Sequence, residues 1–198
     1  MIRRIFQAFL PMLLLMAAVV PCAAQTDDGP KHSKEYRSAV AKIEQVQSDA
    51  NRGTPQQMVF TAEELSAYVN EGGVNLPLGV DNVKFTGRPG VITGVTKVDF
   101  DKITAGKMSM NPLMMLFTGI HEVTVIADAE GTAGRATLNV QSVQIDGVTV
   151  PRTALEFFVT KYIQPKYGHN IGMNDLFQMP AHIDSATVGE NTLTVVQK

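Results

Sequence analysis

The hydrophobic pattern in the first third of the chain predicts two amphipathic helices separated by a short strand. Apolar residues recur at helical spacing over Ser33–Asn51, and the glycine and proline within 53–55 end the pattern. Met58–Phe60 is predicted to be a short strand. The hydroxyl of Thr61 and the carboxylate of Glu64, three residues later, form a capping box, which is a sequence signature of a helix start.

Alternation of apolar and polar residues in the middle of the chain predicts two long hairpins. The first pairs Val80–Thr86 with Val91–Phe100, and the second pairs His121–Ala129 with Arg135–Ile145. Glycine-containing turns separate the partners in both hairpins. In the last of these strands the apolar positions change face near Gln141–Ser142, which predicts a β-bulge and a bend.

The last third of the chain predicts one more helix and a closing hairpin. After a short strand at Val148–Val150, Pro151 suits the first turn of a helix, and we expect Pro165 to end that helix. Ile183–Val188 and Thr192–Val196 are predicted to form the final hairpin. The apolar stripe of the helix consists of Leu155, Phe158, Val159 and Tyr162.

The order of these elements predicts the fold class. Strands joined as hairpins, and not through strand–helix–strand units, favour an antiparallel sheet. We therefore predict an α+β fold, in which a long, curved antiparallel sheet wraps around amphipathic helices. The sequence shows no internal repeat of the length found in solenoids, about 20–50 residues.

The N-terminal residues 1–24 have the pattern of a secretory signal peptide. Arg3 and Arg4 form a basic start, Leu10–Val20 is an apolar stretch, and small residues precede the expected cleavage after Ala24. The prediction is therefore export to the periplasm or the medium.

After the predicted signal peptide we expect two parts, a flexible lead at 25–32 and a single α+β domain at 33–198. Cys22 also permits a lipoprotein anchor, but Pro21 stands where such signals usually have a small residue, so anchoring is disfavoured. After residue 24 no apolar run reaches the roughly 20 residues that span a bilayer. The exported chain is expected to be soluble, with transient membrane contact as one option.

Charge and cysteine content narrow the function classes. Cleavage would remove two of the 17 basic residues and none of the 19 acidic ones, which leaves a net charge of −4, and no basic cluster stands out. Nucleic-acid binding is therefore not expected. The only cysteine lies in the predicted signal peptide, so no disulfide is expected in the exported domain.

No catalytic or cofactor motif is apparent. The four histidines share no close spacing, so we expect surface or loop positions for them, and no Gly-x-Ser-x-Gly motif occurs. Asp99 and Asp101 would share one face of a strand, where two carboxylates could bridge a divalent cation, although two solvated acids at a strand end are commoner. We therefore predict a protein that is not an enzyme and holds no cofactor.

A methionine-rich and strongly apolar segment precedes the second hairpin. Thioethers are soft ligands for Cu(I), so Met108 and Met110, with Met114 and Met115 nearby, allow a copper site as a minor alternative. The run 112–117 is nearly all apolar, which instead favours a core helix, a buried connection, or the wall of an apolar groove.

The predicted helix after Pro151 has an apolar arc wider than one stripe, because Phe157 and Phe158 are adjacent. One side of that arc either packs in the core or lines a cavity. The candidate ligand-binding residues are Leu113, Met114, Met115, Leu116, Phe117, Phe157, Phe158 and Tyr162.

Three segments resemble the tubular lipid-binding domains of bacterial envelope proteins, the TULIP-like and AsmA-like group. They are the capped helix Phe60–Val69, the strand and turn Val143–Val148, and the ending Met179–Val188 with Leu193–Val195. The resemblance implies a half-tube, a highly curved antiparallel sheet around a long helix that encloses an elongated apolar cavity for acyl chains. It implies no catalytic residue.

These observations predict an exported domain that binds a lipid or another apolar small molecule in a hydrophobic groove. The principal alternative is a structural or interaction module of the cell envelope, whose edge strands recruit an envelope protein partner by strand addition.

Overall fold

The computed structural model describes residues 32–47, 56–104, 117–167, 173–179 and 183–197. Within these ranges the alternating segments form one antiparallel sheet accompanied by helices, so the predicted α+β class is confirmed. In chain order the elements are α1 (Lys34–Gln47), β1 (Gln56–Thr61), α2 (Ala62–Asn70), β2 (Val80–Arg88), β3 (Val91–Asp99), α3 (Phe100–Thr104), β4 (Ile120–Thr132), β5 (Arg135–Ile145), β6 (Val148–Thr149), α4 (Arg152–Phe158), the π-helix η4 (Val159–Ile163), α5 (Gln164–Tyr167), β7 (Asn174–Gln178), β8 (Ile183–Gly189) and β9 (Thr192–Gln197).

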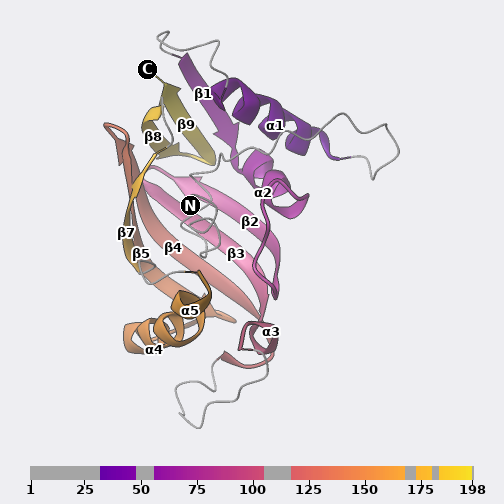
Figure 1. Cartoon of the computed structure of the whole chain (residues 1–198), viewed down its shortest axis with the longest axis vertical. Helices are drawn as coiled ribbons and strands as arrows, with labels where there is room; N and C mark the ends of the chain where they lie inside the picture. Colours follow the sequence, from indigo (N-terminus) through magenta and orange to yellow (C-terminus); the bar gives the residue numbers. More distant parts are fainter. Residues whose placement is uncertain (1–31, 48–55, 105–116, 168–172, 180–182, 198) are drawn as a thin grey trace.

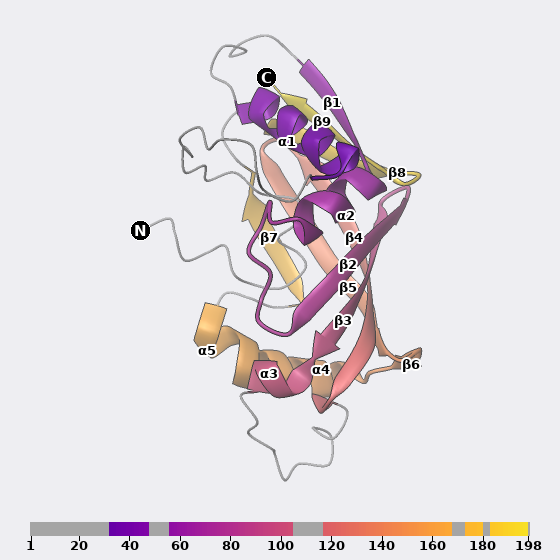
Figure 2. The ribbon, with the colours of Figure 1, turned by 90° about the vertical axis from the view of Figure 1, so that its right-hand side faces the viewer.

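Strand β4 is the central strand of the sheet. The order is β1-β9-β8-β4-β3-β2, with β5 on the other side of β4 and both β6 and β7 paired to β5. One edge of β4 pairs with β3 as far as Asp128, and then Glu130 and Gly131 on the same strand pair with β8. The sheet thus continues from β3 to β8 along a single 13-residue strand, and Figure 2 shows how strongly the strands bend along this length.

Both predicted hairpin turns form, but they are shorter than predicted, because β2 continues to Arg88 and β4 to Thr132. Gly90 has φ +74° in the tight turn between β2 and β3, where its lack of a side chain removes the strain of a positive φ. Ala133 and Gly134 both have positive φ between β4 and β5, the geometry of a two-residue hairpin turn whose twist matches the strands.

The predicted bulge in β5 is confirmed. Val140 pairs with Ala127 and Ser142 pairs with Ile126, so Gln141 has no partner across the ladder. The extra residue shifts the side-chain alternation by one position. Residues three apart across the bulge therefore point to the same face of the sheet. Val140 and Val143 accordingly both lie on the inner face of the sheet, where they pack against the largest core cluster.

Helices lie at both ends of the sheet. Figure 1 shows α1 and α2 near β1 and β2 at one end, and α3, α4 and α5 at the other. An ion pair fixes α1 on α2: the Lys42 ammonium lies 2.6 Å from the Glu64 carboxylate, which also accepts the Ser38 hydroxyl at 2.5 Å and the Thr61 amide at 2.8 Å. The Thr61–Glu64 capping box is therefore formed as predicted, and its carboxylate serves two helices.

Helix α2 covers the outer edge of β2 with polar side chains. The Asn70 side chain accepts the Val83 amide at 2.8 Å and donates to the Val83 carbonyl at 2.6 Å. The Ser66 hydroxyl accepts the Phe85 amide at 2.9 Å. These side chains therefore satisfy backbone groups of β2 that could otherwise pair with a strand of another molecule.

Two sequence predictions at the far end of the sheet are wrong. The strand expected to reach Phe100 ends at Asp99, because the Asp99 carboxylate accepts the Lys102 amide at 3.1 Å and so opens the short helix α3. The helix expected to end at Pro165 continues through it as α5. Just before the proline the helix widens into the π-helix η4, in which the Gln164 amide donates to the Val159 carbonyl, five residues back.

The π-helix has a physical cause in Pro165. A proline inside a helix lacks an N–H, and its ring clashes with the carbonyl four residues earlier, here that of Lys161. A π turn carries one more residue per hydrogen-bonded ring, which moves that carbonyl away from the ring of the proline. The sequence pattern also gave no sign of β7, which pairs with β5 near the C-terminal end of the fold.

The core consists of three groups of buried side chains. One packs α3 and α4 against the sheet, one lies between β4, β5, β8 and β9, and the smallest lies under α2. Within the described residues no helix is long and apolar enough to cross a membrane.

Candidate functional site

An apolar cavity of about 100 Å³ lies on the inner face of the sheet. Alternation along the strands places every second side chain of β3, β4 and β5 on this face, and the bulge in β5 brings both Val140 and Val143 to it. The sheet side of the cavity is lined by Phe85, Ile92, Gly94, Val98, Val123, Val125, Ala127, Leu138, Val140, Val143 and Ile145.

The helical end of the molecule supplies the opposite wall. Its residues come from α3, α4, the π-helix and two short segments next to them, and Val159 and Ile163, four residues apart on η4, share the face that lines the cavity. This side is lined by Phe100, Phe117, Leu155, Phe158, Val159, Ile163 and Met173.

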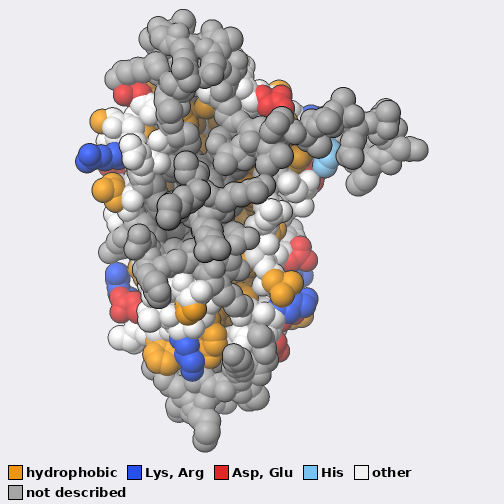
Figure 3. All heavy atoms as spheres, in the orientation of Figure 1, with side chains coloured by type: hydrophobic (Ala, Val, Ile, Leu, Met, Phe, Trp, Pro, Cys, Tyr) orange, Lys and Arg blue, Asp and Glu red, His pale blue; other side chains and the backbone are white. Residues whose placement is uncertain are grey.

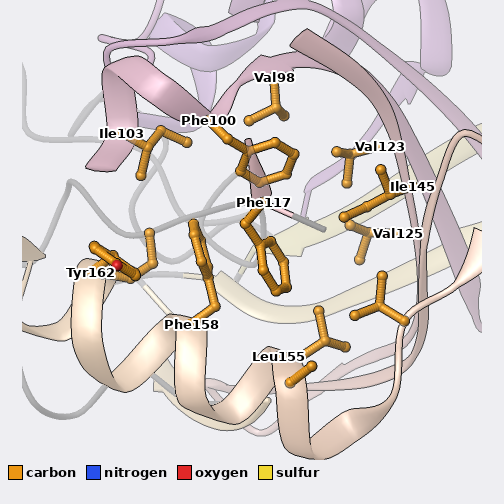
Figure 4. Close-up of a cluster of buried hydrophobic side chains, with 13 residues drawn as sticks. Val98, Phe100, Ile103, Phe117, Val123, Val125, Ile145, Leu155, Phe158 and Tyr162 are labelled. Carbon is orange, nitrogen blue, oxygen red and sulfur yellow. The ribbon is translucent and has the colours of Figure 1, made fainter. Parts of the chain in front are cut away.

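Three phenylalanines form an aromatic cluster in this wall (Figure 4). The rings of Phe117 and Phe158 are stacked with their centroids 4.4 Å apart, and Phe100 meets both edge-on at 5.4 and 5.6 Å. Edge-to-face and stacked pairs of this kind stabilise a site by about 0.5–1.5 kcal/mol each beyond the area that they bury. The three rings therefore hold one another in place and form one end of the cavity wall.

The lining carries no hydrogen-bonding side chain among the described residues. A polar ligand group inside the cavity would lose its bonds to water without replacement, at a cost of roughly 1–3 kcal/mol per group. A lining of this kind therefore suits hydrocarbon groups and disfavours polar ones.

The predicted site residues divide into four groups, of which Phe157 is the last. Phe117 and Phe158 line the cavity and are buried. Tyr162 is buried against Phe158, with ring centroids 5.3 Å apart, but it lies behind the wall and not on the cavity. Leu113, Met114, Met115 and Leu116 lie outside the described residues, as do Met108 and Met110 of the copper alternative.

Phe157 does not line the cavity. Its side chain is 40% exposed, and the Lys161 ammonium lies 5.4 Å from the centre of its ring. Residues 157 and 158 are adjacent on one helix, so a turn of about 100° separates their directions and only Phe158 can face the sheet. Phe157 therefore lies away from the cavity, although the sequence analysis grouped it with Phe158.

Sequence reasoning missed the sheet side of the site. Gly94, Ala127 and Leu138 all line the cavity, yet none was singled out. The alternation that marks them was visible, but it does not tell which face of a strand meets a cavity and which meets packed side chains. A glycine in the middle of a regular strand was the one available signal.

His121 lies at the surface, with its side chain 32% exposed, but both of its ring nitrogens have partners. It lies on β4, its Nδ1 is 2.5 Å from the Asp146 carboxylate, and its Nε2 is 2.7 Å from the Thr118 carbonyl. Both partners are acceptors, so the geometry favours the doubly protonated ring. The hydrogen bond to Asp146 raises the pKa of His121, partly opposed by burial, and the same bond lowers the pKa of Asp146.

This histidine has no free nitrogen to act as a base. Nε2, the atom that would take a proton from a nucleophile, is occupied by the main chain at Thr118. His121 instead links the start of β4 to two other segments. It contacts Asp146 in the turn after β5 and Thr118, which follows the cavity-lining Phe117.

The two carboxylates considered for a cation do not converge. Asp99 caps α3 and lies 3.1 Å from the Lys102 ammonium, whereas Asp101 accepts the Gly119 amide at 3.1 Å. The strand on which both were placed ends between them. No group of three or more acidic, histidine or cysteine side chains suited to a metal ion occurs in the described part of the chain.

On the face shown in Figure 3, basic and acidic side chains among the described residues are scattered on both sides of the molecule, without a patch of one sign. The apolar cavity is therefore the feature with the most definite chemistry. Comparison with protein-family models, with curated proteins and with solved structures found no match for this chain.

Proposed function

We propose that this protein is an exported, non-enzymatic domain that binds an apolar ligand, an acyl chain of a lipid or a similar hydrocarbon, in the cavity between the sheet and α4. The observation that carries the proposal is the cavity itself, about 100 Å³ of space with an entirely apolar described lining. Protein interiors are normally close-packed, so an apolar space of this size between the sheet and α4 is suited to a bound hydrocarbon.

Leaving the cavity empty has an energetic cost. At about 24 cal/mol per Å³, a cavity of about 100 Å³ lowers the free energy of unfolding by roughly 2 kcal/mol. A hydrocarbon chain that fills it recovers this loss, and each buried CH₂ contributes about 0.8 kcal/mol to binding. Affinity of this kind requires no polar motif, which agrees with the absence of one among the lining residues.

The curved sheet supports the lipid-binding half-tube that the sequence resemblance implies. Its strands bend over the helical end of the molecule, and the cavity lies on the inner side of that bend (Figure 2). The resemblance adds the expectation of export through the signal peptide at 1–24 and of a ligand whose polar head stays outside the cavity.

Native mass spectrometry of the protein purified without detergent tests the proposal. We expect co-purifying lipid, or uptake of a fluorescent fatty acid by delipidated protein with 1:1 stoichiometry. Leu155→Trp, which places a larger ring into the lining, should reduce uptake, whereas Phe157→Trp on the exposed side of the same helix should not. A clean apo mass together with no uptake would rule the proposal out.

The alternative function, binding of a partner by strand addition, requires a strand edge with free backbone groups, and two of the edges are partly covered. The outer edge of β2 is bonded by Ser66 and Asn70, and on β1 the Val59 carbonyl accepts the Lys42 ammonium at 2.8 Å. Strand β7, where Leu176 is 65% exposed, is the edge on which a partner would be sought. Leu176→Lys should abolish a pull-down partner if this alternative holds.

A further inference from the structure

We propose that His121 is a positioning residue of the cavity: its hydrogen bond to the Thr118 carbonyl holds Phe117 in the wall, and loss of its proton weakens binding of an apolar ligand. This inference rests on the proposed function, because it assigns a pH-dependent regulation to the same cavity.

His121 lies at the end of the inner face of the sheet, next to the aromatic cluster. It pairs with Val98 across β3 and β4, and directly opposed residues share a face of the sheet. Val98 is buried and lines the cavity. The His121 ring also lies beside that of Phe100, with centroids 6.2 Å apart. A change at His121 therefore acts next to the cavity wall.

The segment that carries Phe117 into the wall is bonded to α3 through Gly119. The Gly119 amide donates to the Asp101 carboxylate at 3.1 Å, and the Gly119 carbonyl accepts the Phe100 amide at 2.8 Å. Both bonds lie two residues after Phe117. The carbonyl of the intervening residue, Thr118, is instead bonded to a side chain of β4.

Loss of the proton from His121 would break this bond to Thr118. The neutral ring has one N–H, whereas both of its nitrogens face acceptors, the Asp146 carboxylate at 2.5 Å and the Thr118 carbonyl at 2.7 Å. A charged acceptor forms the stronger bond, so the remaining proton stays on Nδ1, next to Asp146. Nε2 then presents a lone pair to the Thr118 carbonyl, and the two repel each other. The segment that carries Phe117 thereby loses this bond to β4.

The groups around His121 set the pH at which this happens. The hydrogen bond to Asp146 raises the pKa of His121, burial opposes that increase in part, and the charge of Asp101 adds to it. His121 therefore keeps its proton to a higher pH than an ordinary histidine, and ligand affinity should fall as the pH rises through the raised pKa. The charged side chains on the neighbouring elements are Asp146 of the turn after β5, Asp101 and Lys102 of α3, Lys97 and Asp99 of β3, and Glu122 of β4.

The experiment measures the dissociation constant of 1-octanol by calorimetry between about pH 5.5 and 9, the range in which a histidine titrates. This alcohol has no group that titrates there, so a change with pH reports on the protein. We expect wild type to bind about fivefold more weakly above the pKa of His121, which NMR titration of the imidazole locates. Because the coupling is reciprocal, saturating octanol should raise the pKa of His121.

Two substitutions separate the proton of His121 from the bulk of its side chain. His121→Gln places an amide N–H near the position of Nε2 and cannot titrate, so its affinity should stay close to that of wild type at low pH throughout the range. His121→Leu has no donor, so it should bind weakly at every pH. His32→Gln is the matched control, because His32 lies just before α1 at the other end of the sheet, and it should keep the wild-type pH profile.

The outcomes separate this inference from the function on which it rests. If wild type binds neither octanol nor a fatty acid at any pH, the proposed function fails. If wild type binds octanol equally at every pH, or if His121→Gln keeps the wild-type pH profile, binding stands and the role of His121 is overturned. Should His121→Leu not fold, the profile of His121→Gln and the effect of octanol on the pKa of His121 decide the matter.

Discussion

At the scale of single residues, His121 and Asp146 form a charged pair whose effect on stability depends on pH. The folded-state pKa of His121 lies above its ordinary value of 6.5, so its contribution is complete below about pH 6.5 and is lost as the pH rises through the raised pKa. The pKa of Asp146 is lowered from 3.8, so its contribution is present above that value and disappears as the pH falls through the lowered pKa. We expect the pair to be fully formed between these limits.

Asp146→Asn tests this pair. Removal of the carboxylate should lower the pKa of His121 toward its ordinary value, which NMR titration of the imidazole protons measures. Asp128→Asn is the control, because it makes the same charge change seven residues away on β4, about 23 Å from His121. Identical titration curves in the two variants would show that Asp146 does not hold the histidine in its charged form.

Lys42 and Glu64 are the second residue-scale feature. Burial alone would raise the pKa of Glu64, but hydrogen bonds from Lys42, Ser38 and Thr61 outweigh it, so the net pKa is lowered and the group is charged at neutral pH. Lys42→Met would leave a buried carboxylate without its cation. We expect a loss of about 2 kcal/mol in the free energy of unfolding, measured by urea denaturation.

Lys34→Met serves as the control for Lys42→Met, because the Lys34 side chain is fully at the surface of the same helix and its change should stay within about 0.5 kcal/mol. Equal effects of the two substitutions would contradict a structural role for the Lys42–Glu64 pair.

At the scale of elements, α2 protects the edge of β2 through Asn70. Asn70→Ala removes two hydrogen bonds from the Val83 backbone, so we expect a loss of about 2 kcal/mol in stability and self-association through the uncovered edge. Urea denaturation and size-exclusion chromatography measure the two effects. Asn139→Ala, an exposed change on β5, should show neither.

A stable, monomeric Asn70→Ala variant would mean that the outer edge of β2 needs no cover from α2.

The π-helix is the second element-scale feature, and Pro165→Ala tests its cause. The new amide at 165 can donate to the Lys161 carbonyl, so the helix should return to α register and that amide should become protected from hydrogen exchange. Val159 and Ile163 would then shift relative to the cavity, and fatty-acid binding should weaken. Pro151→Ala, at the start of α4, should leave the register unchanged, and a π turn that persists without Pro165 would overturn this explanation.

Local signals explain which elements the sequence could predict. The capping box at Thr61, the turn at Ala133–Gly134 and the bulge at Gln141 all depend on neighbours within a few residues, and each forms as predicted. The prediction that the helix ends at Pro165 was wrong, because a π-helical segment before the proline lets the helix continue. Strand β7 was missed because its pairing with β5 is set by tertiary contacts and not by its own pattern.

At the scale of the whole molecule, the cavity could not be read from the sequence. Its lining runs from Phe85 to Met173 and joins side chains from all three parts of the core. The sequence pointed to Phe117 and Phe158 because bulky apolar residues stand out. It could not point to Ala127, because a small side chain gives no sign in the sequence that it lines a cavity. The cavity exists only once the strands and α4 are brought together.

The cavity also makes a prediction about the stability of the whole fold. A ligand that binds the folded protein alone adds about 2.7 kcal/mol at a hundred times its dissociation constant. For a chain of this size we expect a rise of about 5–10 °C in melting temperature when delipidated protein is mixed with a saturated fatty acid, followed by calorimetry. Leu155→Trp, which places a larger ring into the cavity lining, should gain less from the acid than wild type does. A fatty acid that lowered both melting temperatures equally would act on the unfolded chain, as a detergent does, and would contradict a specific cavity ligand.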